Sequence, residues 1–150
     1  MKLDQKGYPT PGILVITCNW DGWSCIEAVV SAGLKYPSSV QVVKVNCLSR
    51  VHAGLMLQAL DLGADGLMLL GCEPGKCHFG ADSDCVRKEY EKARTILELL
   101  GMDINRLILV QLPAFSGHKF VAKLLKFCEE IKQIPTSDDT DKLGVQATGR

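Results

Sequence analysis

Four short, continuous apolar runs alternate with helical patterns along the chain, and this alternation constrains the fold more than any other feature. The runs have the length and the Val, Ile and Leu content of buried strands. They are Ile13 to Thr17, Val40 to Val45, Leu67 to Leu70, and Leu107 to Leu112. The helical patterns cover Ser24 to Lys35, His52 to Leu62, Ser83 to Leu100, and Gly117 to Lys132. Because such alternation gives parallel sheets with helices on both faces, we expect a small flavodoxin-like α/β domain with a four-stranded parallel sheet.

The composition predicts a single folded domain. The chain has 150 residues, of which 47% are hydrophobic and 23% charged, and at this size a core forms without a disulfide or metal to hold it. We place the domain at residues 12–134. Residues 1–11 contain Gly7, Pro9 and Pro11 and predict a loose lead-in, and the polar residues 135–150 predict a flexible C-terminal tail.

The charge balance and the apolar runs exclude two classes of function. Lys plus Arg and Asp plus Glu both total 17, so the chain has no basic stripe that would bind nucleic acid. No apolar run approaches the roughly 20 residues that span a membrane, and the N-terminal residues lack the apolar segment of a secretory signal. We therefore expect a cytoplasmic protein with no membrane span.

Seven cysteines are many for such a chain, and their positions favour a metal or redox site. Cys18, Cys47 and Cys72 follow the first three predicted strands. Because the carboxyl ends of parallel strands meet at one edge of a sheet, these thiols should lie close together. Cys25 and Cys77 are expected on the loops that leave the first and third strands. The sequence thus predicts five thiols around one pocket.

Thiolates in this number favour an iron-sulfur cluster, which four cysteines usually bind. Gly71 and Gly75 flank Cys72 closely enough for backbone N–H groups to reach cluster sulfurs. A 2Fe-2S cluster with four thiolates has a net charge of about −2, so Arg50 and Lys76 nearby would favour reduction. The alternatives are a salt bridge at the start of the second helix for Arg50 and an ordinary solvated loop position for Lys76.

The remaining cysteines and the histidines are weaker candidates for ligands. Cys128 lies on the apolar stripe of the last helical pattern and is expected in the core. Cys85 lies near the start of the third helix, where a thiolate can be stabilised, and is kept in reserve. His52 and His78 are possible ligands, but the available thiols suit a soft metal better.

Other residues near the expected site allow several roles. Trp20 and Trp23 can shield a metal centre, pack the loop onto the sheet or anchor a partner. The segment from Pro113 to His118 can form part of the pocket wall or of a docking surface. The chain has no G-x-S-x-G, no phosphate-binding loop and no G-x-G-x-x-G after the first strand, so an electron relay fits better than an enzyme that converts a substrate.

Two other classes of function remain open. Zinc can also bind four thiolates, which would make the chain a structural adaptor, with or without metal, although structural zinc sites usually pair their ligands as C-x2-C. A thiol-disulfide enzyme could use Cys18 with Cys25 or Cys72 with Cys77. Neither pair has the C-x-x-C spacing typical of such enzymes.

Five segments together resemble one known family. They are Cys18-Asn-Trp, Cys47-Leu-Ser-Arg-Val, Gly63-Ala-Asp-Gly66, Gly71-Cys-Glu-Pro-Gly-Lys-Cys-His-Phe79 and Lys119-Phe. From about Gly12 to Ile131 the sequence resembles the delta subunit of methyl-viologen-reducing hydrogenase. The resemblance implies a cytoplasmic 2Fe-2S protein. It would relay electrons between a hydrogenase, formate dehydrogenase or similar donor and the flavin subunit of heterodisulfide reductase, in a complex that performs flavin-based electron bifurcation or confurcation.

The resemblance also implies a set of ligands. Cys18, Cys47, Cys72 and Cys77 match cysteines of the family. The family commonly has Cys-x-x-Cys after the first strand, but here the second position is Asp21 and the next thiol is Cys25. Either Cys25 has taken over that ligand or the missing position is not a ligand.

Overall fold

A parallel sheet forms the centre of the computed structural model, which describes residues 2–3, 9–80 and 83–135. Its four strands lie in the order β4-β3-β5-β6 and all pair in parallel. They are β3 (Ile13–Cys18), β4 (Val40–Val45), β5 (Gly66–Gly71) and β6 (Leu107–Gln111). The predicted α/β class and four-stranded parallel sheet are confirmed.

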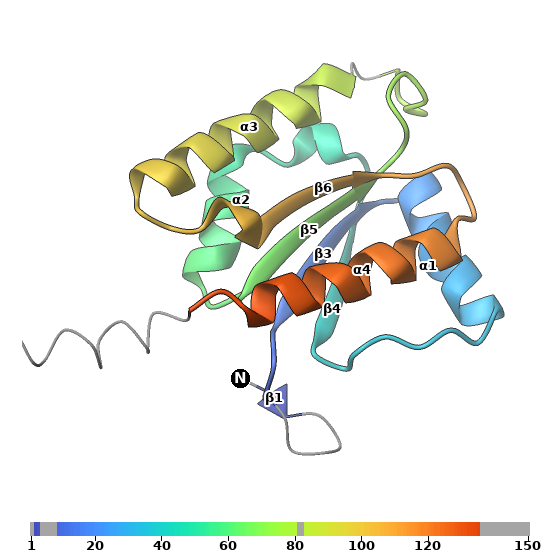
Figure 1. Cartoon of the computed structure of the whole chain (residues 1–150). Coiled ribbons are helices and arrows are strands. Elements are labelled where there is room, and N and C mark those ends of the chain that lie inside the picture. The colour runs from blue at the N-terminus through green and yellow to red at the C-terminus, as the bar shows by residue number, and fades with distance from the viewer. Residues whose placement is uncertain (1, 4–8, 81–82, 136–150) are drawn as a thin grey trace, which may run out of the picture.

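Two helices cover each face of this sheet (Figure 1). One face carries α1 (Asp21–Ser31) and α4 (Gly117–Lys132), and the other carries α2 (Ala53–Asp61) and α3 (Ser83–Leu99). Two short 3-10 helices, η1 (Leu48–Arg50) and η2 (Ile104–Arg106), precede α2 and β6.

The sheet divides the hydrophobic core into two clusters because successive side chains of a strand point to opposite faces. Val15 belongs to the cluster under α1 and α4, which also contains Phe120. Its neighbour Ile16 belongs to the cluster under α2 and α3, with Leu97. All residues of β5 are buried, which explains why its sequence is continuously apolar rather than alternating.

The strand order places the carboxyl end of β3 between its two neighbours. From β3 the chain passes to β4 on one side and then to β5 on the other. Cys18 lies opposite Val45 of β4, and Thr17 lies opposite Leu70 of β5. Ligands of open α/β sheets bind at such a reversal of strand order, so the residues that follow β3, β4 and β5 form the natural site.

Helix α1 begins three residues earlier than the predicted Ser24 and ends at Ser31 rather than Lys35. Gly33 ends the helix in a left-handed conformation, with a φ of 65°. Its N–H donates to Val30 O, and the next N–H, that of Leu34, donates to Val29 O. The early start of α1 has a different cause: thiols at the edge of the sheet accept its first N–H groups.

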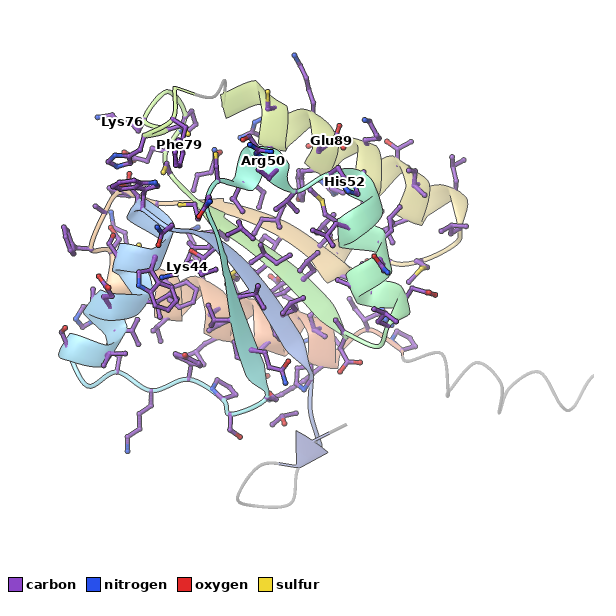
Figure 2. The ribbon with its side chains drawn as sticks, turned by 180° about the vertical axis from the view of Figure 1, so that it is seen from behind. Lys44, Arg50, His52, Lys76, Phe79 and Glu89 are labelled. Carbon is purple, nitrogen blue, oxygen red and sulfur yellow. The ribbon has the colours of Figure 1, made fainter. Side chains whose placement is uncertain are left out.

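Helix α2 begins where two side chains accept its free N–H groups. The Nδ1 atom of His52 accepts the N–H of Leu55, and a carboxylate oxygen of Glu89 on α3 accepts the N–H of Ala53 (Figure 2). These bonds satisfy two of the donors that every helix N-terminus leaves free. They fix α2 against α3 on that face of the sheet.

The N-terminal residues that the structure describes form a short pair of strands. β1 (Lys2–Leu3) runs antiparallel to β2 (Pro9–Thr10). The rest of the expected lead-in, residues 1 and 4–8, and the expected tail at residues 136–150 lie outside the described residues. Among the residues that are described, no helix is long and apolar enough to cross a membrane.

Candidate metal centre

Four thiols line one pocket at the carboxyl edge of the sheet. The Sγ atoms of Cys18 and Cys72 are 3.7 Å apart, and those of Cys47 and Cys77 are 3.6 Å apart. The thiols therefore form two close pairs, the Cys18–Cys72 pair and the Cys47–Cys77 pair, in one hollow.

The strand order brings these thiols together from distant parts of the sequence. Cys18 is the last residue of β3, and Cys72 directly follows β5. Cys47 follows β4 and precedes η1, while Cys77 lies farther along the loop between β5 and α3. The prediction that thiols at three strand ends meet is thus confirmed for Cys18, Cys47 and Cys72.

The N-terminus of α1 points at the Cys18–Cys72 pair. The N–H of Gly22 donates to Cys18 Sγ over 3.3 Å, and the N–H of Asp21 donates to Cys72. No side chain caps α1 at Trp20, so the sulfurs accept N–H groups that a capping residue would otherwise take. This explains why the helix begins before Ser24 without an ordinary sequence signal.

Gly22 allows this close approach. A Cβ atom at this position would lie 2.5 Å from the carbonyl oxygen of Leu70 and 3.1 Å from Cys18 Sγ, and it would also collide with Thr17 Oγ1. Any side chain would therefore push the first turn of α1 away from both the sheet and the thiol.

The two pairs differ in their electrostatic environment. Burial raises the pKa of Cys72, and the charges of Cys18 and Asp21 raise it further. The Asp21 N–H opposes this rise, and the resulting pKa is about 12. Burial also raises the pKa of Cys47, but here the opposing interactions are stronger. Hydrogen bonds from Ser49 and Cys77 and the charge of Arg50 bring the pKa of Cys47 below its ordinary value.

Ser49 provides one of these bonds through its side chain. Its hydroxyl donates to Cys47 Sγ over 3.1 Å. Ser49, Asp21 and Gly22 were not predicted from the sequence as part of the site. A serine two residues after a possible acceptor commonly bonds locally, and that spacing was the available signal.

Aromatic side chains form part of the pocket wall. Trp20 and Phe79 both line the pocket while remaining 43% and 59% exposed. Trp23 instead packs against the core under α1 and α4, with Lys44 Nζ 4.4 Å from the centre of its ring. Of the two tryptophans, Trp20 is placed to shield the thiols and Trp23 to hold α1 on the sheet.

The predicted glycines and cations lie at the same end of the sheet. Gly71 lines the pocket, where a Cβ atom would lie 2.6 Å from Leu48 Cδ1. Gly75 forms a turn in the following loop, with a φ of 77°. Arg50 and Lys76 are exposed side chains (Figure 2). Among the described residues, neither takes part in an ion pair. Of these two cations, Arg50 is the one whose charge lowers the pKa of a thiol, that of Cys47.

Cys25 does not lie on a loop, and that part of the prediction is wrong. Because α1 begins at Asp21, Cys25 is inside the helix, where its side chain is 0% exposed. Its thiol donates to the carbonyl oxygen of Pro113 over 3.5 Å, and burial raises its pKa. Cys25 does not line the pocket of the other four thiols.

The two remaining cysteines differ from each other. Cys128 is buried in the core under α1 and α4, as predicted. Cys85 is exposed near the start of α3 and does not line the pocket, although the adjacent Val86 does.

The histidines and the turn after β6 have other contacts. His52 caps α2, as described above, and His78 Nε2 lies 3.2 Å from Asp21 Oδ1. The turn that begins at Pro113 contacts α1, because the N–H of Phe115 donates to Ser24 Oγ. Within residues 2–3, 9–80 and 83–135, no three His, Cys, Asp or Glu side chains gather around one point that could hold a single metal ion.

Comparison with known proteins identifies the family. The model of the family described as methyl-viologen-reducing hydrogenase, delta subunit, matches residues 13–135. The chain belongs to this family. The resemblance seen in the sequence motifs is thereby confirmed, and the delta-subunit family match covers strands β3 to β6 and helices α1 to α4.

Hydrogenase subunits and heterodisulfide reductase subunits are both similar to this delta-subunit family member. An iron-sulfur subunit of the F420-non-reducing hydrogenase of Archaeoglobus profundus is 30% identical over 83% of this chain and 90% of its own length. A subunit of the ferredoxin:CoB-CoM heterodisulfide reductase of Methanosarcina mazei is 27% identical over 93% of this chain. The corresponding reductase subunit of Methanosarcina acetivorans is 27% identical over 83% of this chain. The chain spans only 18% and 16% of the length of these two reductase subunits.

Proposed function

We propose that the chain binds one 2Fe-2S cluster through Cys18, Cys47, Cys72 and Cys77 and serves as an electron-transfer subunit of an oxidoreductase complex. The observation that carries this proposal is the pairing of four thiols in one pocket, with Sγ to Sγ distances of 3.7 Å and 3.6 Å. The cluster domain in this proposal comprises residues 12–134.

Both distances fit thiolates that share a tetrahedral metal ion. With metal-sulfur bonds of about 2.3 Å, tetrahedral geometry separates two sulfurs by about 3.8 Å. Two such pairs in one pocket suit a centre with two metal ions, each bound by two cysteines. Soft thiolates are the ligands that iron-sulfur clusters take.

A mononuclear zinc site is less well supported. Zinc in a structural site needs about four ligands around one point, whereas the close sulfur contacts here join the thiols two by two. The core also consists of apolar side chains on both faces of the sheet, so the fold does not depend on a metal to replace a core. A zinc-bound or metal-free adaptor and a thiol-disulfide enzyme are therefore alternative outcomes of the test below.

The residues around the thiols suit electron transfer. A bound 2Fe-2S cluster supplies a carrier for single electrons. The N–H groups of Asp21 and Gly22 and the hydroxyl of Ser49 donate to the thiolates and stabilise their negative charge. Arg50 adds positive charge beside Cys47, and Trp20 covers part of the pocket against water.

The names of the relatives support the partners in this proposal. One relative is named as an iron-sulfur subunit of a hydrogenase, and two are named as subunits of heterodisulfide reductase. In those two, a region similar to this chain forms part of a longer polypeptide, which favours close association with such a reductase. We propose that this chain accepts electrons from a hydrogenase or formate dehydrogenase and passes them to the flavin subunit of a heterodisulfide-reductase-like complex. In this proposal the complex lies in the cytoplasm and performs flavin-based electron bifurcation.

Metal analysis of anaerobically purified protein tests the proposed cluster. We expect about two irons and two acid-labile sulfides per chain, little zinc, and an EPR signal after reduction with dithionite. Zinc without sulfide would support the adaptor, and absence of metal with a reactive dithiol would support the thiol-disulfide enzyme. Either result would refute the proposed function.

Cysteine variants test the ligand set. Replacing Cys18, Cys47, Cys72 or Cys77 by Ser should sharply lower the iron content. Cys25→Ser is the matched control, since its thiol contacts the Pro113 carbonyl instead of the pocket, and it should retain iron. Loss of iron in Cys25→Ser with retention in one of the other four would contradict the proposed ligands.

A further inference from the structure

Cys77 is the proposed ligand that lies farthest in the sequence from any strand or helix. It is the first residue of the second of two turns in the loop that joins β5 and α3. The first turn is closed by the Lys76 N–H, which donates to Glu73 O, and the second by the Gly80 N–H, which donates to Cys77 O. Both turns contain a glycine with positive φ. Contacts between this loop and other parts of the fold therefore help to set the position of the Cys77 thiol.

Two side chains of the loop contact the start of α1. The ring of His78 stacks on the ring of Trp20, with centroids 4.4 Å apart and an interplanar angle of 15°. His78 Nε2 also lies 3.2 Å from Asp21 Oδ1. Phe79 meets Trp20 edge to face, with centroids 6.1 Å apart (Figure 2 shows Phe79 on this loop).

The residues that receive these contacts belong to the other side of the pocket. Trp20 and Asp21 lie two and three residues after Cys18, and the Asp21 N–H donates to Cys72. The same short segment thus contacts the Cys18–Cys72 pair through its backbone and the Cys77 loop through its side chains. Such a segment can fix the distance between the two thiol pairs.

We propose that Trp20, Asp21 and His78 form a clamp that positions Cys77, and with it the Cys47–Cys77 pair, relative to the Cys18–Cys72 pair. The inference deepens the proposed function, since it assigns positioning residues to the same site. These residues are not ligands. They act by keeping the gap between the two pairs constant, which a centre with two metal ions requires.

The clamp has polar and aromatic components that separate variants can distinguish. His78→Ala removes both the stack and the contact with Asp21, whereas His78→Phe keeps a ring for Trp20 but loses the contact with Asp21. Asp21→Asn keeps a polar partner without the charge. His118→Ala is the matched control, because His118 is an exposed histidine on α4, far from the loop in sequence.

Hydrogen exchange of the metal-free protein tests the clamp without any cluster. In His78→Ala, we expect amides of residues 75–80 to exchange about tenfold faster, the effect of losing an aromatic stack together with a partly exposed polar contact. His78→Phe should recover much of the protection. The denaturant midpoint should fall only slightly, since the same contacts are lost and the His78 side chain is 45% exposed. Protection equal to that of His118→Ala would overturn the proposal.

The iron-loaded protein gives a second measurement. His78→Ala should bind iron but release it to a chelator several-fold faster than the unmodified protein, and its EPR line shape should change. The release rate of His78→Phe should lie between the rates of these two proteins. Release at the same rate in all variants would also overturn the clamp. If the protein holds no iron-sulfur cluster, the hydrogen exchange result still decides the clamp, so the two proposals fail separately.

Discussion

Ser49→Ala is the substitution that most directly tests how the chain tunes its proposed cluster. The Ser49 hydroxyl donates to Cys47 Sγ over 3.1 Å. Since the hydroxyl bonds a sulfur that becomes more negative on reduction, its removal should destabilise the reduced state more than the oxidised state. We therefore expect a more negative reduction potential.

The size of this shift follows from the strength of the bond. A hydrogen bond to a charged group contributes about 1.5 to 3 kcal/mol. If about half of that strength is gained on reduction, the potential falls by about 30 to 60 mV, because about 59 mV corresponds to a tenfold change in a one-electron equilibrium. Ser49 is exposed, and water competes for the sulfur, so we expect a value near the lower limit.

Dye-mediated redox titration, followed by EPR, measures the shift. Ser49→Thr keeps a hydroxyl and should retain most of the original potential, while Ser31→Ala removes an exposed serine at the end of α1 and should change nothing. In the metal-free protein, Ser49→Ala should also slow alkylation of Cys47, because loss of the bond raises the pKa of this thiol. An unchanged potential together with unchanged alkylation would refute the reasoning.

Three further predictions concern packing, thiol reactivity and the metal. In a denaturant titration, Gly22→Ala should lower the free energy of unfolding by about 1 to 3 kcal/mol because of the collisions described above. Gly12→Ala is the control: its Cβ would meet its nearest neighbour at 3.5 Å, so the free energy of unfolding should change by less than about 0.5 kcal/mol. In the metal-free protein near neutral pH, iodoacetamide should modify Cys47 faster than Cys72. The rate for Cys72 should keep rising toward pH 12, because the pKa of this thiol is about 12. Equal modification rates by mass spectrometry would contradict these pKa directions. Removal of the metal by a chelator should leave the far-UV circular dichroism intact, since apolar clusters hold the fold; loss of the spectrum would show a metal-dependent fold.

The sheet and its helices were predictable because their sequence signals are strong. The run from Val40 to Val45 matches β4 at both ends, and the pattern from Gly117 to Lys132 matches α4. Apolar runs of strand length and helical periodicity depend only on burial. The meeting of Cys18, Cys47 and Cys72 followed from strand direction alone.

The start of α1 was not predictable from local signals. Its first N–H groups are satisfied by thiols, one of which follows β5 more than fifty residues later. Sequence rules for capping consider only neighbouring residues. Because the sequence predicts a later start for α1, it also predicts Cys25 on a loop, whereas in the structure Cys25 lies in the helix with its thiol buried.

The pairing of the thiols and the contacts of His78 also depended on the folded structure. Sequence order suggested which cysteines share an edge but not that Cys18 pairs with Cys72 and Cys47 with Cys77. From the sequence, His78 is a possible ligand; the folded structure instead shows that its ring stacks on Trp20 and contacts Asp21.

The central position of β3 has a consequence for the order of events in the cell. Cys18 comes to lie near Cys47 and Cys72 only after β3 has paired with β4 on one side and with β5 on the other. A growing polypeptide therefore offers no complete set of four thiols until Cys77 has been made and the strands before it have paired. For the proposed cluster, this pairing implies that iron and sulfide are delivered after β3, β4 and β5 have come together.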